Sequence, residues 1–103
     1  MGHDARKVSI RINKGELAAI LQFDEQLRDA NGIQLLTPEG RILLRLALDG
    51  AMTVSAAEPL AATSRATYFT VLRRLKDAGL ISAIPDANDA RVRVLRAGVD
   101  TQS

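Results

Sequence analysis

Residues 64–74 combine hydroxyl and guanidinium side chains with one aromatic ring, a mixture suited to binding a polyanion. Serine and threonine hydroxyls and the free backbone N–H groups at the start of a helix can hold phosphate oxygens, and the planar fork of arginine fits the edge of a guanine base. Two further arginines follow near the C-terminus. The candidate contact residues are Ser64, Arg65, Thr67, Phe69, Thr70, Arg73, Arg74, Arg91 and Arg93.

The distribution of charge favours the same chemistry. The formal net charge is only +2, and residues 1–50 carry seven basic and seven acidic side chains. Residues 64–96, in contrast, carry seven basic side chains against three acidic ones. Because arginine supplies most of this excess, the segment suits phosphates and guanine edges. A solvated charged surface is the alternative interpretation of a charge block of this size.

Other kinds of chemistry find little support in the sequence. The 103 residues include no cysteine and one histidine, His3, which argues against disulfides, thiol catalysis and His-based catalytic or metal sites. There is no nucleophile–base pair or phosphate loop, so we expect no enzyme, no cofactor and no metal. No apolar run reaches the length of a membrane span, and no signal-peptide pattern is present. The sequence therefore predicts one soluble, cytoplasmic domain without a membrane partner.

The hydrophobic pattern predicts the elements that must position these side chains. Alternating apolar residues predict strands over 7–13 and 91–96, and residues 80–85 are expected to be extended, with a turn at 86–89 before the last strand. N-capping residues and glycine stops predict the helices, and Ser55 with Glu58 is expected to form a capping box. The expected helices cover 14–31, 38–49, 55–62 and 65–78.

The helix expected over 65–78 has a clear apolar face. At about 100° per residue, its buried positions should be Tyr68, Val71, Leu72 and Leu75. These side chains should pack on Leu43, Leu46 and Leu60. The outward face would then carry Ala66, Thr70, Arg73 and Asp77, flanked by Thr67, Phe69, Arg74 and Lys76.

The order of elements from residue 37 onward is helix, short strand, helix, helix, strand, turn, strand. This order predicts a winged helix-turn-helix, mainly α with a small β-wing (α+β), preceded by an N-terminal strand and helix. The expected organisation is a strand–helix arm over 1–36 that could serve dimerisation, the winged domain over 37–96, and a C-terminal tail over 97–103.

Several segments resemble the multiple-antibiotic-resistance-regulator (MarR) family of transcriptional regulators, whose helix-turn-helix pattern lies over residues 53–81 without a gap. The matching pieces are 53–55, 63–67 and 72–81, the helix start at 37–39, and the wing at 85–91 with its Asp89-x-Arg91. The resemblance implies a DNA-binding regulator whose helix over 65–78 enters the major groove, with the wing beside it.

Three departures from the MarR pattern stand out. Pro59 and Leu60 replace the family's usual polar or basic residues, and Ala62 replaces the customary glycine of the turn, so the turn could differ. The sequence ends at Ser103, before the family's long C-terminal dimerisation helices. We therefore expect a short form, for which a small-molecule effector is not supported.

Some candidate residues have two interpretations. Phe69 lies either at the edge of the core or against a thymine methyl group. Arg91 either enters the minor groove or forms an ion pair with Asp89 or Asp86 that holds the hairpin. Arg73 and Arg74 are either contacts or solvated, and Arg93 is a phosphate contact or a solvent-exposed group rather than a reader of bases.

The N-terminal arm carries a second, shorter resemblance. Residues 7–12 followed by a capped helix resemble the opening of a ribbon-helix-helix repressor, in which the polar strand face, here Lys7, Ser9 and Arg11, would read DNA. The interpretation that we prefer is a strand and helix that support the winged domain or its dimer.

The sequence thus predicts a sequence-specific DNA-binding transcriptional regulator that binds double-stranded DNA as a homodimer. The alternative is a winged-helix module for protein–protein contact within a larger complex. The mild net charge and the exposed Phe69 keep that alternative open.

Overall fold

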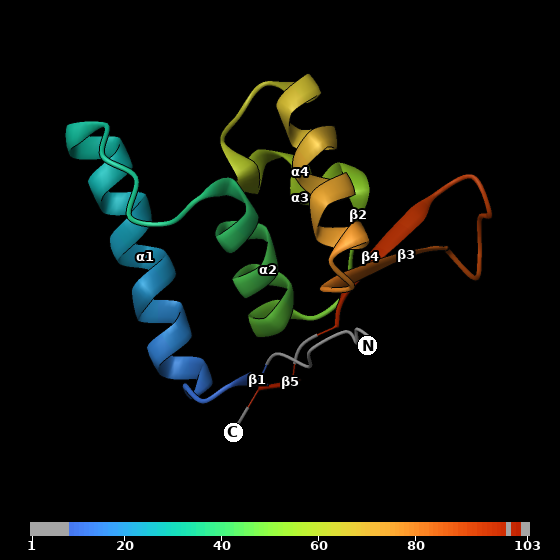
Figure 1. Ribbon diagram of the computed structural model, residues 1–103, viewed down its shortest axis with the longest axis horizontal. Helices are drawn as coiled ribbons and strands as arrows, with labels where there is room; N and C mark the ends of the chain where they lie inside the picture. The colour runs from blue at the N-terminus through green and yellow to red at the C-terminus, as the bar shows by residue number, and fades with distance from the viewer. Residues whose placement is uncertain (1–8, 99, 102–103) are drawn as a thin grey trace, which may run out of the picture.

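The computed structural model describes residues 9–98 and 100–101, which form four helices and a small antiparallel sheet (Figure 1). In chain order the elements are β1 (Ser9–Ile10), α1 (Lys14–Asn31), α2 (Pro38–Asp49), β2 (Met52–Thr53), α3 (Val54–Ala61), α4 (Arg65–Asp77), β3 (Ile81–Pro85), β4 (Arg93–Ala97) and β5 (Asp100–Thr101).

The sheet and the last three helices form a winged helix-turn-helix. The strand order is β2-β4-β3, and β4 runs antiparallel to both neighbours. In Figure 1, α1 lies at one end of the molecule and the tip of the β3–β4 hairpin lies at the other, with α2 between α1 and the α3–α4 pair. The predicted fold class, mainly α with a small β-wing, is therefore confirmed.

Local sequence signals account for the bounds of α1 and α2. The Asn13 side chain accepts from the Glu16 N–H at 2.8 Å, and the Glu16 carboxylate accepts from the Asn13 N–H. Both hydrogen bonds of a capping box are therefore present. Gly32 ends α1 in the left-handed conformation, at φ 67°. Thr37 caps α2 by accepting from the Gly40 N–H at 3.0 Å. Both helices have the bounds that the sequence predicts.

The start of α3 differs from the prediction. Thr53, not Ser55, is the N-cap, and its hydroxyl accepts from the Ala56 N–H at 3.1 Å. The reason is that Met52 and Thr53 pair with β4, which holds Thr53 extended directly before the helix. Pro59 consequently lies in the second turn of α3, where it has no N–H to donate to the backbone.

The turn between α3 and α4 keeps a left-handed residue although the usual glycine is absent. Ala62 adopts φ 54° and ψ 44°, and its N–H donates to the Pro59 carbonyl at 3.2 Å. Among the described residues, Ala62 is the one non-glycine residue with positive φ. The backbone of the turn therefore demands a conformation that an L side chain adopts at a cost.

We expect Ala62→Gly to raise the free energy of unfolding by about 1 kcal/mol, because glycine removes that strain. The measurement is urea denaturation followed by circular dichroism. Ala19→Gly in the exposed middle of α1 is the matched control, and it should lower stability by about 0.5–1 kcal/mol. A destabilised Ala62→Gly variant would contradict the assignment of strain.

The inner face of α4 forms the main hydrophobic core, as its spacing predicts. Tyr68, Val71, Leu72 and Leu75 are all buried, and they pack with Leu46. Leu43 and Leu60 are partly buried and pack against the same cluster, so the predicted packing is confirmed. Since this face is fixed inward, the opposite face of α4 must lie outward.

The two ends of the described chain lie side by side. Ser9–Ile10 pair in parallel with Asp100–Thr101, and Lys7 of the ribbon-helix-helix interpretation lies outside the described residues. Within the expected tail, Ala97 ends β4 and residues 100–101 form β5. Gly98 permits this return, because a Cβ there would lie 2.9 Å from the Gly79 carbonyl oxygen. The boundaries at 36/37 and 96/97 stay predictions.

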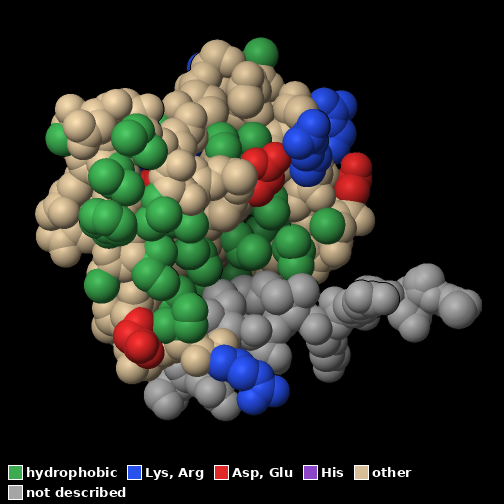
Figure 2. Space-filling view, turned by 60° about the vertical axis from the view of Figure 1, so that its left-hand side comes forward, with side chains coloured by type: hydrophobic (Ala, Val, Ile, Leu, Met, Phe, Trp, Pro, Cys, Tyr) green, Lys and Arg blue, Asp and Glu red, His purple; other side chains and the backbone are tan. Residues whose placement is uncertain are grey.

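Helix α1 packs on the rest of the molecule along one narrow stripe. Its buried residues are Leu17, Leu21 and Asp24. Large apolar side chains remain about half exposed on α1 and the following linker, namely Phe23, Ile33 and Leu35. Figure 2 shows apolar side chains gathered on the face that includes this side of the molecule. The stripe therefore holds α1 through few side chains, one of them a carboxylate.

Candidate nucleic-acid interface

The N-terminus of α4 places three of the predicted site residues on one exposed turn. The Ser64 hydroxyl accepts from the Thr67 N–H at 3.2 Å and donates to the Thr67 hydroxyl at 3.0 Å. The Arg65 guanidinium lies 5.8 Å from the centre of the Phe69 ring. The remaining N–H groups of this first turn have no intrahelical acceptor, so the turn is suited to an anion.

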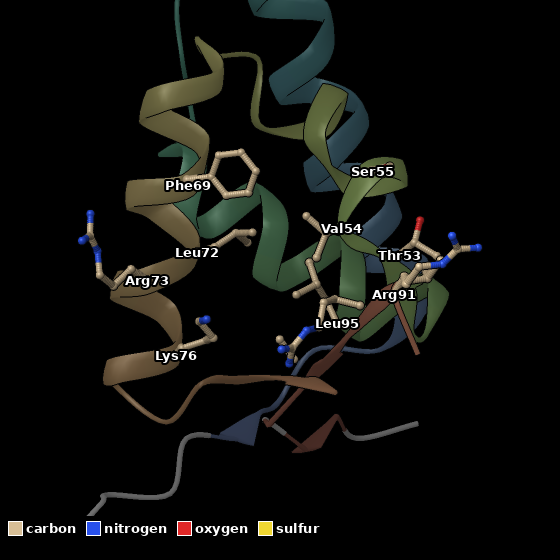
Figure 3. Close-up of a pocket in the computed structure, with 12 residues that line it drawn as sticks. Thr53, Val54, Ser55, Phe69, Leu72, Arg73, Lys76, Arg91 and Leu95 are labelled. Carbon is tan, nitrogen blue, oxygen red and sulfur yellow. The ribbon is translucent and has the colours of Figure 1, made fainter. Parts of the chain in front are cut away.

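A groove of about 740 Å³ separates α4 from the wing (Figure 3). Its walls come from the start of α3, the side of α4 that faces the wing, and the strands and turn of the β3–β4 hairpin. The lining residues are Thr53, Val54, Ser55, Phe69, Leu72, Arg73, Lys76, Ala83, Arg91, Val92, Arg93 and Leu95. Four of them are basic and none is acidic. The groove is therefore a site of positive potential with an apolar floor.

The structure brings some predicted site residues to this groove and leaves others elsewhere. Phe69, Arg73, Arg91 and Arg93 line it, and the Phe69 side chain is 44% exposed. Thr70 donates its hydroxyl proton to the Ala66 carbonyl of its own helix at 3.2 Å. Phe69 is thus an exposed side chain over the groove rather than part of the buried core.

Arg74 points away from the groove toward α2. Its guanidinium lies 3.2 Å from a carboxylate oxygen of Glu39, and the ion pair is exposed on the arginine side. Such an exposed pair contributes little to stability. The geometry of Arg74 therefore matches a surface ion pair, and a role in binding stays a prediction for this residue.

The wing holds Arg91 in its turn rather than in a strand. The predicted strand over 91–96 begins at Arg93, because Asp89 accepts from both the backbone N–H and the Nε of Arg91, at 3.1 and 3.2 Å. These bonds from Arg91 lower the pKa of the Asp89 carboxyl. The Arg91 side chain is nevertheless 91% exposed. The ion pair between Arg91 and Asp89, one of the two interpretations of Arg91 from the sequence, is present. The guanidinium still faces solvent beside the groove.

Sequence reasoning missed three polar residues of the groove. Lys76 was expected only on a flank, whereas Thr53 and Ser55 were assigned to the strand and helix start alone. The position of Lys76 could have been found from its spacing, since residues three apart in a helix share a side, and Arg73 was already a candidate. The contribution of Thr53 and Ser55 depends on how α3 packs beside the wing.

No protein-family model and no curated protein sequence matches the chain, but solved structures do. PcaV from Streptomyces coelicolor, a transcriptional regulator, has a TM-score of 0.55 and 25% identity over 81% of this chain and 60% of its own. The regulator Tm0710 from Thermotoga maritima has a TM-score of 0.55 and 19% identity over 81% and 58%. MarR has a TM-score of 0.53 and 19% identity over 84% and 65%.

The fold is MarR-like. The fold that the sequence resemblance implied is therefore confirmed, and the chain spans about three fifths of the length of the solved regulators that it matches. The structures named above are those of regulators, not of enzymes. PcaV was solved in complex with its natural ligand, so this neighbour gives no support to the expectation that ligand sensing should not be carried over to this chain.

The described residues contain no helix that is both long enough and apolar enough to cross a membrane.

Proposed function

We propose that the protein is a sequence-specific DNA-binding transcriptional regulator that inserts α4 into the major groove and lays the β3–β4 wing beside it. The observation that carries the proposal is the groove between α4 and the wing, whose lining includes four basic side chains and no acidic one. α4 and the wing that follows it in the chain thereby present one basic surface, as a duplex with charged backbones requires.

The chemistry of the surface divides into positioning and reading. Arg91 and Arg93 on the wing and the first turn of α4 suit phosphate oxygens, which fix the register of the protein on the duplex. Arg65 and Thr67 lie where the start of a recognition helix meets base edges. Specificity would then come from α4 and much of the affinity from the wing.

We further infer that the protein acts as a homodimer and not as an enzyme. A short recognition helix reads only a few base pairs, and regulators of this type gain specificity by binding two half-sites related by symmetry. The regulators with the same fold support a binding function rather than catalysis.

Arg65→Ala and Arg91→Ala test the division between reading and positioning. Arg65→Ala should weaken binding to the cognate duplex by about 1–3 kcal/mol, and it should weaken binding to scrambled DNA less. Arg91→Ala should weaken both, with a salt dependence shallower by about one unit because one phosphate contact is lost. The measurement is a salt series of fluorescence-anisotropy titrations on a duplex selected by the wild type from a random pool.

Arg45→Ala is the matched control, because Arg45 lies on α2 in an ion pair with Asp49 and outside the groove. It should leave both affinities unchanged. Equal, salt-independent binding by the wild type and by the Arg65 and Arg91 variants would exclude the DNA-reading function.

One observation favours a second candidate, a winged-helix module for protein–protein contact. Phe69 is 44% exposed beside the apolar floor formed by Val54, Leu72 and Leu95. An aromatic anchor over an apolar floor is typical of a protein interface. This candidate would lead if the salt series showed no DNA binding.

A further inference from the structure

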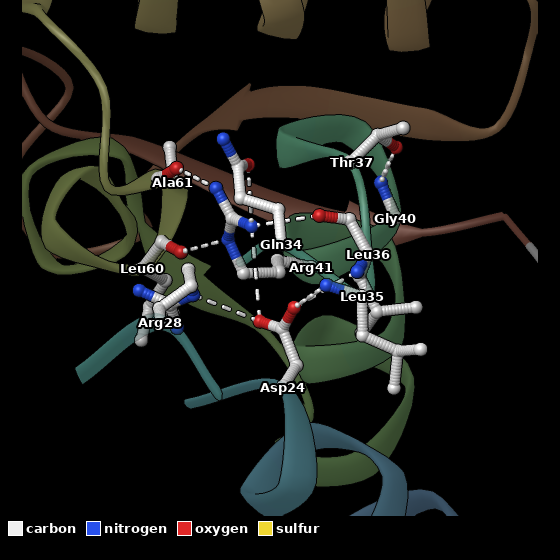
Figure 4. Close-up of polar contacts among 10 residues, drawn as sticks. All are labelled: Asp24, Arg28, Gln34, Leu35, Leu36, Thr37, Gly40, Arg41, Leu60 and Ala61. Atoms are coloured by element: carbon white, nitrogen blue, oxygen red, sulfur yellow. Dashed lines mark hydrogen bonds and ion pairs between the residues drawn. The ribbon is translucent and has the colours of Figure 1, made fainter. Parts of the chain in front are cut away.

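Arg41 is a buried arginine that contacts the helix-turn-helix from outside it. It lies on α2, and only 2% of its surface is exposed. Its Nε donates to the Leu60 carbonyl at 3.1 Å and its Nη2 donates to the Ala61 carbonyl (Figure 4). These carbonyls belong to the last two residues of α3, and no N–H group within that helix can donate to them. Arg41 therefore caps the C-terminus of α3 with a positive charge.

The remaining donors of Arg41 hold the linker between α1 and α2. Its Nη1 donates to the Leu36 carbonyl at 2.8 Å and to the Gln34 side-chain oxygen at 3.1 Å. The guanidinium thus joins the linker to the end of α3, and its planar fork makes the several contacts at once.

Asp24 on α1 holds Arg41 from the other side. The Asp24 side chain is fully buried, and one of its carboxylate oxygens accepts from the N–H groups of Leu35 and Leu36 at 2.9 and 2.8 Å. The other oxygen accepts from Arg28 Nε at 3.0 Å and lies 3.7 Å from Arg41 Nη1. Asp24 and Arg41 therefore bind Leu36 through its N–H and its carbonyl, and a continuous polar path runs from α1 to the end of α3.

The end of α3 determines where α4 begins. Only residues 62–64 separate the two helices, and Ala62 is held in the left-handed conformation. The start of α3 is fixed independently, because the Tyr68 hydroxyl of α4 donates to the Val54 carbonyl at 2.6 Å. The start of α3 is therefore attached to α4 and its end to Arg41, and these contacts restrict the geometry of the turn before Ser64.

We propose that Arg41 is a positioning residue for DNA recognition by α4. Asp24 on α1 takes part in this role because it holds Arg41 against the turn at residues 62–64. The part of this proposal that concerns DNA binding rests on the proposed function. Without the Asp24–Arg41 contact, the turn at 62–64 gains freedom, and the first turn of α4 no longer presents Arg65 and Thr67 in one orientation. Loss of this preorganisation lowers specificity, while phosphate contacts from the wing are retained.

The test compares Asp24→Asn and Arg41→Lys with the wild type at a temperature where circular dichroism shows all three folded. Asp49→Asn is the matched control, because it breaks the exposed Arg45–Asp49 pair on α2. We expect both network variants to lower the ratio of affinities for the selected and scrambled duplexes by about tenfold, a typical coupling between sites. Binding to the scrambled duplex should change by less than about twofold.

If Asp24→Asn does not fold, Arg28→Gln replaces it, since Arg28 contacts Asp24 from a partly exposed position. It should lower the same affinity ratio by at least about threefold. Folded variants that keep the wild-type ratio would overturn the proposal.

Amide hydrogen exchange separates this proposal from the proposed function, because it needs no DNA. In the network variants the hydrogen-bonded amides of Ala62 and Thr67 should exchange at least about tenfold faster, while those of 71–75 in the core of α4 stay at the wild-type rate. Unchanged exchange at Ala62 and Thr67 refutes the positioning role even if the protein binds DNA. Faster exchange at these amides in a protein that binds no DNA would support the coupling between the Asp24–Arg41 contact and the turn. That result would refute only the proposed function.

Discussion

Replacing Asp24 by alanine is expected to lower the free energy of unfolding by about 3–5 kcal/mol, the usual cost of removing one partner from a buried ion pair. The carboxylate is fully buried and accepts three hydrogen bonds, two from backbone N–H groups and one from Arg28. Its loss would leave the N–H groups of Leu35 and Leu36 without an acceptor and Arg41 without its buried counter-charge. For a domain of this size such a loss is a large part of the total stability.

The measurement is urea denaturation at pH 7, with Asp29→Ala as the control on the exposed side of the same helix. The control should change stability by less than about 0.5 kcal/mol. A similarly small effect of Asp24→Ala would show that the carboxylate does not contribute through the contacts described here.

The same carboxylate predicts how stability depends on pH. Burial on its own raises the pKa of Asp24, but the Leu36 N–H, Arg28 and Arg41 together bring the pKa below its ordinary value of 3.8. A lowered pKa in the folded state means that the carboxylate stabilises the fold above pH 3.8, and that this contribution is lost as the pH falls through the lowered value. Asp24→Ala should therefore lose less stability than the wild type on acidification.

Replacing Tyr68 by alanine is expected to cost about 3–5 kcal/mol, because the ring is fully buried at the centre of the core. Tyr68→Phe keeps the ring and removes only the hydroxyl that donates to Val54, so it should cost about 0.5–1.5 kcal/mol. The pair of variants separates the packing of the ring from the bond between α3 and α4. Equal losses in the two variants would show that the ring itself contributes nothing.

Alkaline pH gives a second measurement on Tyr68. Burial, and then the negative charge of Glu58, raise the pKa of Tyr68 to about 12. The neutral phenol is therefore favoured in the folded state, and its contribution is complete below the ordinary pKa of 10.0 and is lost as the pH rises toward 12. Tyr68→Phe should be less sensitive than the wild type over this range in denaturant titrations.

The buried face of α4 could be predicted from the sequence because its cause is local. Apolar residues three and four positions apart share a side of any α-helix, so Tyr68, Val71, Leu72 and Leu75 define the inner face before any packing is known. The caps at Asn13, Thr37 and Ser64 are also local.

The contact between Asp24 and Arg41 could not be predicted in the same way, because its partners lie on different helices. One signal was present: Arg41 lies in the first turn of α2, where the helix dipole disfavours a positive charge. An arginine at that position requires a compensating partner, and Asp24 with Arg28 one turn further on supplied a candidate. Only the packing of α1 on α2 shows that the two charges meet.

The corrections in the wing and at α3 have a similar origin. The predicted capping box at Ser55 and Glu58 satisfies local rules, but pairing between β2 and β4 places the extended residue two positions earlier. Alternation alone extends the last strand back to Arg91, whereas the bonds from Arg91 to Asp89 keep that residue in the turn. In both cases a contact between distant segments decides between two acceptable local solutions.

The composition of the Asp24–Arg41 contact set constrains how the sequence can diverge. A change at one of the two positions leaves a buried charge uncompensated, whereas a joint change to apolar residues of similar volume leaves none. The two positions should therefore covary among homologues. Leu35, Leu36, Leu60 and Ala61 join the network only through backbone atoms. The exposed side chain of Leu35 is therefore free to vary without breaking the network, whereas Leu60 and Ala61 are constrained by their packing in the core.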